Sequence, residues 1–147
     1  MQRAGASIAL ALLLPCAARA DEVLGVRCVA FSPDGKLLAA STGEPKQRGT
    51  VTLWDVATRA RVWGHQEDTG AGAVAFSPDG KALAVAVYGN AARLLDVDSG
   101  KVKATLNHPK EVRAVAFSPD GKLLATACWD KLVRVWDVAR AASEKAS

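Results

Sequence analysis

Short apolar runs, rich in valine and alanine, alternate along this chain with clusters of turn-forming residues. Each run is four to seven residues long, which is typical of β-strands and too short for most helices. Three runs precede a Ser-Pro-Asp-Gly cluster, at 26–30, 72–75 and 112–116, and three follow one, at 36–42, 81–87 and 122–128. The pattern therefore predicts three antiparallel hairpins.

The turn sequence itself explains why a hairpin corner forms there. Phe-Ser-Pro-Asp-Gly occurs at 31–35, 76–80 and 117–121. Proline presets φ for the first corner of a type I turn, aspartate can accept bonds from the nearby backbone, and glycine adopts the left-handed conformation that rejoins the second strand. We expect each copy to connect two paired strands.

A second marker shows that the hairpins belong to a longer repeat. Leu-Trp-Asp-Val at 53–56, Leu-Leu-Asp-Val at 94–97 and Val-Trp-Asp-Val at 135–138 are each 41 residues apart. The phenylalanines are 45 and then 41 residues apart, which places a loop extension at 44–49 of the first unit. Runs at 50–56, 91–97 and 132–138 predict a third strand, and the run at 101–106 predicts a fourth.

Most runs lack strict alternation of apolar and polar residues, which indicates sheets with both faces largely covered. The sequence predicts an all-β fold of about three four-stranded antiparallel units that stack face to face, at about 21–67, 68–108 and 109–141. Only the polar, alanine-rich end follows Val138, with a tail from 142 to 147, so the third unit is expected to lack a clear outer strand.

These motifs resemble the WD-repeat β-propeller family in its bacterial style, over essentially 21–140. Trp54 and Trp136, each followed by aspartate, favour this family over periplasmic Tol-associated propellers, which also carry Ser-Pro-Asp-Gly turns. Propellers typically close with 4 to 8 blades. The resemblance therefore implies a partial propeller, an incomplete ring.

The family pattern also implies a buried hydrogen-bond relay that stiffens a blade. The third unit supplies a complete structural tetrad: His108, Thr126, Asp130 and Trp136. The first unit has Trp54 without the histidine, and the second retains His65 without the other members. We interpret these residues as scaffold, because no serine or cysteine nucleophile with an oxyanion loop accompanies His108 and Asp130.

The resemblance places partner binding on the face that carries the loops between second and third strands and the loops entering the first strand. The residues at those positions are Arg27, Tyr88, Arg113 and Trp129, types that are enriched in interface hot spots. We expect a non-catalytic scaffold that binds a protein or peptide, and self-association that covers the open blades. The alternative is the N-terminal portion of a larger propeller-containing enzyme, or of a Tol-associated type of propeller.

Charge adds little to this picture. Nineteen Lys and Arg residues against 15 Asp and Glu give a net charge of +4, spread evenly and without the basic stripe that nucleic acid binding needs. Phosphate loops, haem-attachment cysteines and zinc-ligand spacings are missing, so no cofactor or metal is expected.

The first twenty residues predict an export signal: a basic start, the apolar run Ala-Ser-Ile-Ala-Leu-Ala-Leu-Leu-Leu, and small residues before a cleavage site after Ala20. That run is shorter than the roughly 20 residues of a membrane span. A lipoprotein start at Cys16 is disfavoured by Pro15, and the expected location is periplasmic or secreted. Cys28 and Cys128 are interpreted as small buried residues, with a bridge between them left open.

Overall fold

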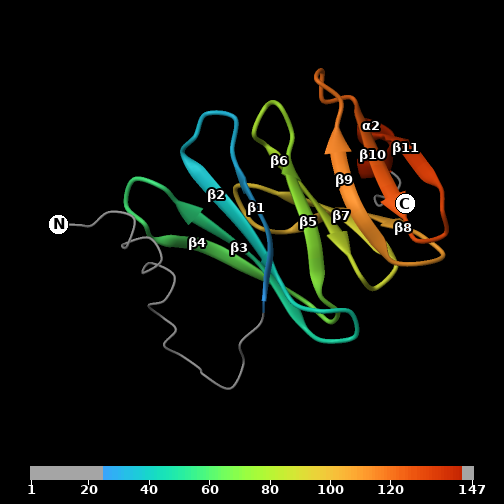
Figure 1. Ribbon diagram of the computed structural model, residues 1–147. Helices are drawn as coiled ribbons and strands as arrows, with labels where there is room; N and C mark the ends of the chain where they lie inside the picture. Colours follow the sequence, from blue (N-terminus) through green and yellow to red (C-terminus); the bar gives the residue numbers. More distant parts are fainter. Residues whose placement is uncertain (1–24, 144–147) are drawn as a thin grey trace.

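The fold consists of three antiparallel sheets that stand side by side like the blades of a fan (Figure 1). The computed structural model describes residues 25–143, so the predicted export signal, with Cys16 and Ala20, lies outside the described residues. Within the described part, eleven strands form two sheets of four strands and one of three, and strands pair in chain order in every sheet. The predicted all-β class, the stacked blades and the missing outer strand of the third blade are confirmed.

The strands have the following bounds. The first sheet contains β1 (Val26–Phe31), β2 (Leu37–Thr42), β3 (Gly49–Asp55) and β4 (Arg61–Glu67). The second contains β5 (Ala71–Phe76), β6 (Ala82–Val87), β7 (Ala91–Asp96) and β8 (Val102–Asn107). The third contains β9 (Val112–Phe117), β10 (Leu123–Cys128) and β11 (Val133–Asp137).

A short helix, α2 (Val138–Ser143), follows β11 where the sequence predicted only a polar, alanine-rich end. The Asp137 carboxylate accepts a hydrogen bond from the Arg140 amide at 2.9 Å, which caps the first turn of the helix. Val138 and Ala141 pack against the core between the second and third sheets. The helix therefore follows the third strand of its sheet at the position where the first two sheets have the turn that leads to their fourth strand.

Each Ser-Pro-Asp-Gly cluster forms the predicted hairpin corner. In the first copy the Ser32 carbonyl accepts from the Gly35 amide at 2.8 Å, and Gly35 has a φ of 73°. The Asp34 carboxylate accepts from the Ser32 hydroxyl at 2.6 Å and from the Lys36 amide at 3.0 Å. The same bonds recur around Asp79 and Asp120, so the repeated sequence encodes a repeated turn.

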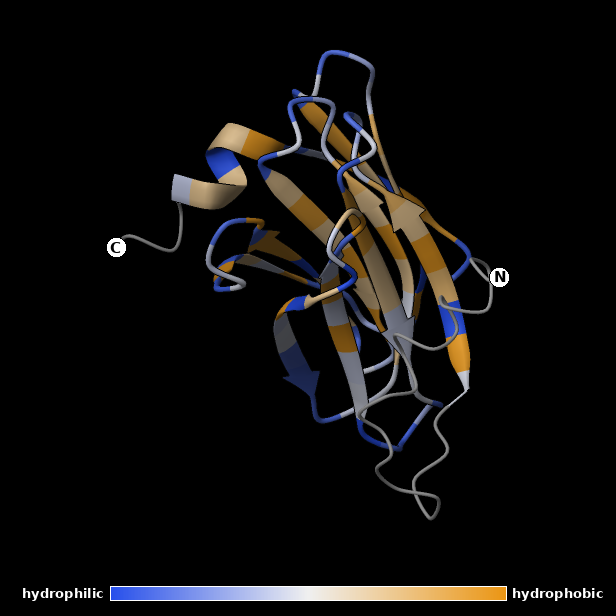
Figure 2. Ribbon diagram, turned by 90° about the vertical axis from the view of Figure 1, so that its left-hand side faces the viewer, coloured by the Kyte–Doolittle hydropathy of each residue, from blue (hydrophilic) through white to orange (hydrophobic). Residues whose placement is uncertain are grey.

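The core lies between the sheets, in two layers. The innermost strands β1, β5 and β9 contact one another in that order. Ala39, Val51 and Leu53 of the first sheet pack on Leu83, Val85 and Leu95 of the second, and a second cluster joins the second sheet to the third. Figure 2 shows the apolar residues concentrated along these strands.

Among the sheets formed by residues 25–143, the second alone is covered on both faces. Five consecutive residues of β6, Leu83–Val87, are buried, whereas β1 and β11 are largely exposed on alternate positions. The expectation that every sheet is covered on both faces is therefore wrong for the first and third. These sheets stand at the ends of the stack, so each has one neighbour within the described residues.

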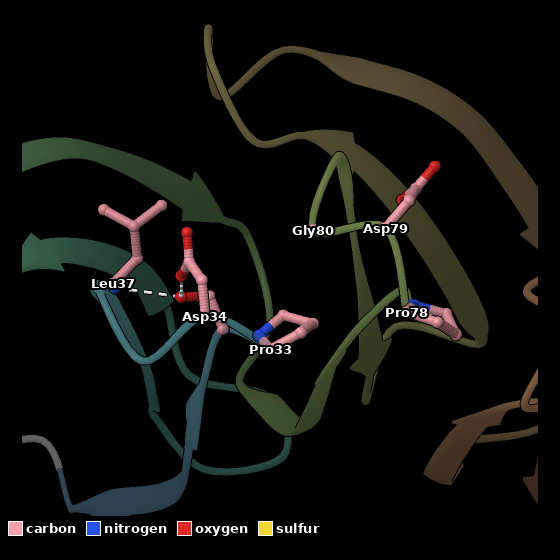
Figure 3. A pocket seen from close by; sticks show the side chains of 7 residues that line it. Pro33, Asp34, Leu37, Pro78, Asp79 and Gly80 are labelled. Carbon is pink, nitrogen blue, oxygen red and sulfur yellow. Dashed lines mark hydrogen bonds between the residues drawn. The ribbon is translucent and has the colours of Figure 1, made fainter.

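Successive turns also contact each other across the sheets. A Cβ added to Gly80 would lie 3.8 Å from Pro33 Cδ, and one added to Gly121 would lie 3.3 Å from Pro78 Cδ. A cavity of about 360 Å³ lies between the first two turns, beside Pro33 and Pro78 (Figure 3). The carboxylates that line it, Asp34 and Asp79, are already bonded within their own turns.

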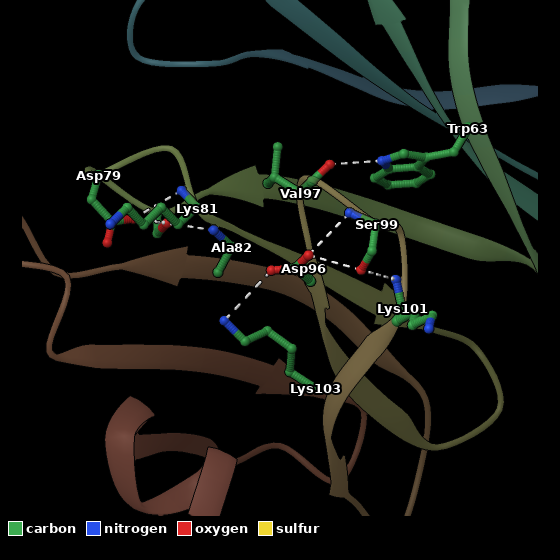
Figure 4. Close-up of polar contacts among 10 residues, drawn as sticks. Trp63, Asp79, Lys81, Ala82, Asp96, Val97, Ser99, Lys101 and Lys103 are labelled. Carbon is green, nitrogen blue, oxygen red and sulfur yellow. Dashed lines mark hydrogen bonds and ion pairs between the residues drawn. The ribbon is translucent and has the colours of Figure 1, made fainter.

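At the outer edge, one side chain ties the first sheet to the second. Trp63 of β4 donates its indole N–H to the Val97 carbonyl at 2.7 Å, and its ring lies against Gly100 (Figure 4). Gly100 has a φ of 72°, and a Cβ there would meet the ring at 2.8 Å. The turn between β7 and β8 therefore packs closely against Trp63 of the first sheet.

The turn aspartates predict how stability depends on pH. Hydrogen bonds from serine hydroxyls, and then from lysine amides, lower the pKa of Asp34, Asp79 and Asp120 below the ordinary 3.8. A lowered folded-state pKa stabilises the fold above the unfolded value, and this contribution is lost as the pH falls through the folded value. The unfolding free energy should therefore fall as the pH drops below about 4.

Urea unfolding at pH 7 and pH 3 tests this for the native chain and for a variant with all three aspartates changed to asparagine. We expect the variant to be less stable at pH 7 and to lose less stability on acidification. Asp98→Asn, at an exposed position outside these turns, is the control. An unchanged pH dependence in the triple variant would contradict the assignment.

Candidate functional site

Arg113 lies between two aromatic rings on the edge of the sheets opposite the Ser-Pro-Asp-Gly turns. Its guanidinium carbon is 4.8 Å from the centroid of the Tyr88 ring and 4.4 Å from that of the Trp129 ring. Both distances are within the range of a cation–π contact. The structure thus brings together three of the four residues that the sequence predicted for partner binding, which we call the aromatic-arginine stack.

The repeat explains how this stack forms. Tyr88 follows β6 and Trp129 follows β10, at equivalent positions of neighbouring blades, and Arg113 lies near the start of β9 between them. The second blade has Gly72 at the position of Arg113, and a Cβ there would lie 3.1 Å from the Tyr88 ring. Glycine therefore leaves room for the tyrosine to pack beside its own blade.

Hydrogen bonds hold the arginine in place from one side. Arg113 donates from Nη2 to the Glu111 carboxylate at 2.7 Å, and the Trp129 amide donates to the Glu111 carbonyl at 2.9 Å. The Arg113 side chain is 36% exposed, while its Nε atom is buried and has no hydrogen-bond partner within the described residues. Trp129 is 63% exposed, so the stack presents an indole ring to solvent.

Arg27, the fourth predicted residue, lies apart from this stack. It donates from Nε to the Gly43 carbonyl at 3.0 Å and forms an ion pair with Glu44. The first blade has Gly43 where the other two have Tyr88 and Trp129. Arg27 therefore pairs with the loop extension of its own blade, because that blade provides no ring.

Three residues of the predicted tetrad form a continuous relay. Trp136 Nε1 donates to Thr126 Oγ1 at 3.0 Å, and that hydroxyl lies 2.8 Å from His108 Nε2. His108 Nδ1 lies 2.8 Å from the Leu106 carbonyl, which can only accept. Because a carbonyl has no proton to donate, His108 Nδ1 is the donor of this bond.

Asp130 is bonded elsewhere. Its carboxylate accepts from Arg134 Nη2 at 2.6 Å and from the Leu132 amide at 3.1 Å. The hydrogen bond from Arg134 holds the pKa of this carboxyl well below its usual range. The structure therefore joins His108, Thr126 and Trp136 and places Asp130 in a separate ion pair of the same blade.

Where the second repeat would have the relay, an ion pair joins Glu67, the last residue of β4 in the first sheet, to Arg93 of β7 in the second sheet, and the sequence analysis missed it. Glu67, nine residues before Phe76 as His108 is before Phe117, is 3% exposed. Arg93, at the position of Arg134, donates from Nε to both Glu67 oxygens at 2.7 and 2.9 Å. The nine-residue spacing was the signal that could have found Glu67.

Trp54 and His65, which the sequence analysis assigned to incomplete tetrads, both lie on the first sheet. His65 lies in β4, the outer strand of the first sheet, and its Nε2 is 3.1 Å from Glu67 Oε1. Glu67, not His65, stands at the position of His108, so the prediction that His65 is the relay histidine of the second unit was wrong. Trp54 lies in β3, half-buried, and alternates with Val51 and Leu53, which face the second sheet. Its ring is therefore on the outer face of the first sheet.

Other features of the described residues add no further candidate. Cys28 and Cys128 are both free. No cluster of three potential metal-ligating residues occurs within 25–143, and that segment contains no helix long and apolar enough to cross a membrane.

The stacked antiparallel sheets, with β1, β5 and β9 innermost, define a partial β-propeller. Two family models match the chain. The model described as "WD domain, G-beta repeat" matches residues 21–55 and 100–137, and the "Anaphase-promoting complex subunit 4 WD40 domain" model matches 57–111. The chain belongs to the WD-repeat family, whose domains generally mediate protein interactions and are typically non-catalytic scaffolds. No curated protein matches it.

Changing Thr126 to valine tests the relay. The substitution leaves the Trp136 N–H and His108 Nε2 unpaired in the interior, and each buried unpaired group costs about 1–3 kcal/mol. We expect the unfolding free energy to fall by about 2 kcal/mol or more in urea titrations. Thr126→Ser, which keeps the hydroxyl, is the matched control and should lose less. A Thr126→Val variant that is no less stable than Thr126→Ser would contradict the stabilising role of the relay.

Proposed function

We propose that the protein is an exported, non-catalytic scaffold that binds a protein or peptide partner through the aromatic-arginine stack. The single observation that carries this is the position of Arg113 between Tyr88 and a largely exposed Trp129. Exposed tryptophan and arginine are the side chains that most often dominate binding energy in interfaces. A side chain of the partner that is apolar or aromatic would bury the exposed part of the indole.

The geometry of the turn supports a preorganised site. The Trp129 amide is bonded to Glu111, the Lys131 amide donates to the Cys128 carbonyl at 3.1 Å, and Asp130 accepts from the Leu132 amide. A turn that is already fixed loses little conformational entropy on binding. Arg113 supports one side of the indole, so the ring is held in a defined orientation.

The proposed non-catalytic role rests on the family and on the state of the two groups that most resemble a catalytic pair. His108 is bonded on both ring nitrogens within the relay, and Asp130 is bonded to Arg134. Both groups therefore serve the packing of the third blade in this structure. Binding, rather than acid–base chemistry, is the use that the exposed residues support.

Export is proposed on the sequence of the first twenty residues, and the location that follows is periplasmic or secreted. N-terminal sequencing of the protein purified from its native host tests this. We expect the chain to begin at Asp21, after removal of the basic start and the apolar run. An intact Met1 in the purified protein would contradict the proposed export.

We further propose that the protein self-associates. The first and third sheets expose large apolar side chains on their outer faces, including Phe31 at 63% and Val133 at 70%. Contiguous exposed apolar patches of this kind usually mark an interaction surface.

Trp129→Ala tests the partner-binding face. Removing the exposed indole should weaken partner binding roughly tenfold or more, as expected for a hot-spot residue. The measurement is quantitative capture from a native extract by the immobilised chain, followed by titration of the captured partner. Trp129 is exposed, so the variant should keep its thermal stability.

Val56→Ala is the control, because it also truncates an exposed apolar side chain but lies beside the Ser-Pro-Asp-Gly end of the sheets, where its amide is bonded to Lys36. Equal binding by the native chain and Trp129→Ala would remove the stack from the partner site.

A further inference from the structure

The outer faces of the first and third sheets both expose apolar side chains, but these side chains differ in size. On the first sheet the exposed side chains are bulky, with Val29 at 58% and Phe31 at 63% exposure, and Trp54 lies on the same face. On the third sheet they are mostly small or β-branched, with Ala114 and Ala116 exposed on β9 and Val135 63% exposed on β11, and Leu123 is 42% exposed at the start of β10.

The buried interface between the second and third sheets shows which faces fit together. The second sheet contributes a face that is mostly alanine, with two leucines on its outer strands: Ala73, Ala75, Ala84, Ala86, Ala92, Leu94, Ala104 and Leu106. The third sheet contributes a bulky face: Val115, Phe117, Leu124 and Trp136. Small side chains on one blade thus make room for large ones on the next, as close packing requires.

The outer face of the third sheet repeats the small set 41 residues later. The residues at the equivalent positions are Ala114, Ala116, Ala125, Ala127, Val133 and Val135. The outer face of the first sheet repeats the bulky set: Val29, Phe31, Leu38 and Trp54. The described residues therefore carry both halves of one more blade interface, on two faces at opposite ends of the stack.

The turns continue the same pattern. Pro33 contacts the position of Gly80, and Pro78 contacts that of Gly121, so each proline meets the glycine of the next blade. Nothing lies within 4 Å of a Cβ added to Gly35, the first glycine of the series. Pro119 is the last proline, and the third sheet has no following blade in the described residues to meet it. An additional interface would pair these two residues.

We infer that the small-residue face of the third sheet docks on the bulky face of the first sheet of a second copy. This inference rests on the self-association proposed above and specifies its geometry. Docking by the interface already present within the chain gives two copies with two identical joints and a ring of six blades. Propellers close with 4 to 8 blades, whereas three copies would give nine. Two copies of the three described blades therefore give a ring within this range.

Two charged variants, one on each face, test this arrangement in the full chain. Val135→Lys and Phe31→Glu each place a charge in both joints, at positions exposed enough that the single chain should still fold. Sedimentation should give twice the chain mass for the native protein, and each variant should dimerise at least about tenfold more weakly. Asp98→Lys, in the exposed turn between β7 and β8, is the control and should dimerise normally.

Mixing the two variants distinguishes this head-to-tail arrangement from others. A mixed pair has one joint with two native faces and one joint that places lysine against glutamate, so the mixture should form more dimer than either variant alone. A native chain that stays monomeric would overturn self-association itself. Loss of dimer in only one variant, no gain on mixing, or open-ended oligomers larger than a dimer would overturn the ring and leave self-association standing. None of these variants changes a residue of the aromatic-arginine stack, and the partner-binding proposal is tested by a separate measurement, the affinity of the captured partner for Trp129→Ala.

Discussion

The packing of a small-residue face on a bulky face is the interaction on which the rest of this structure depends. Each blade alone is a small antiparallel sheet that buries little, and an isolated sheet of this size is marginal in water. Alanines on one blade let phenylalanine, leucine and tryptophan of the next approach closely enough to exclude water, as Ala84 and Ala86 do beside Leu124. The second sheet is the best-buried part of the chain because it alone uses both of its faces.

This packing also fixes the surface features. Once two blades stack, the loop after β6 must lie next to the start of β9. Tyr88 therefore meets Arg113, although the two residues are far apart in the sequence. The same constraint brings Pro78 beside Gly121 at the opposite end. The relay of His108, Thr126 and Trp136 also crosses a blade boundary, because His108 is bonded through Nδ1 to the Leu106 carbonyl and through its amide to the Asn90 carbonyl, both of the second blade. The arrangement of these surface residues is therefore a consequence of how each blade packs on the next.

The features that could be predicted from the sequence are those determined within one repeat. The Ser-Pro-Asp-Gly corners form as expected because proline, aspartate and glycine act within five residues. Glu67 and Arg93 were missed because their ion pair replaces a relay of different chemistry, and only spacing connects Glu67 with His108. His65 was misassigned because a histidine near the expected place was favoured over the exact spacing. Arg27 and Arg113 occupy the same repeat position, yet only Arg113 has rings beside it, since Gly43 stands where Tyr88 and Trp129 stand in the other blades.

The inferred ring connects assembly with the proposed binding face. Within the chain, the packing of the third blade on the second places Arg113 beside Tyr88 of the preceding blade. The same packing at the joint between copies would place Arg27 of one copy beside Trp129 of the other. Arg27 is held by the Gly43 carbonyl and Glu44, so reaching the indole would require it to exchange those partners for a cation–π contact. A partner that buries Trp129 would then compete with that contact. Binding and assembly would be coupled through one side chain, and a partner's affinity would depend on whether the joint beside Trp129 is closed.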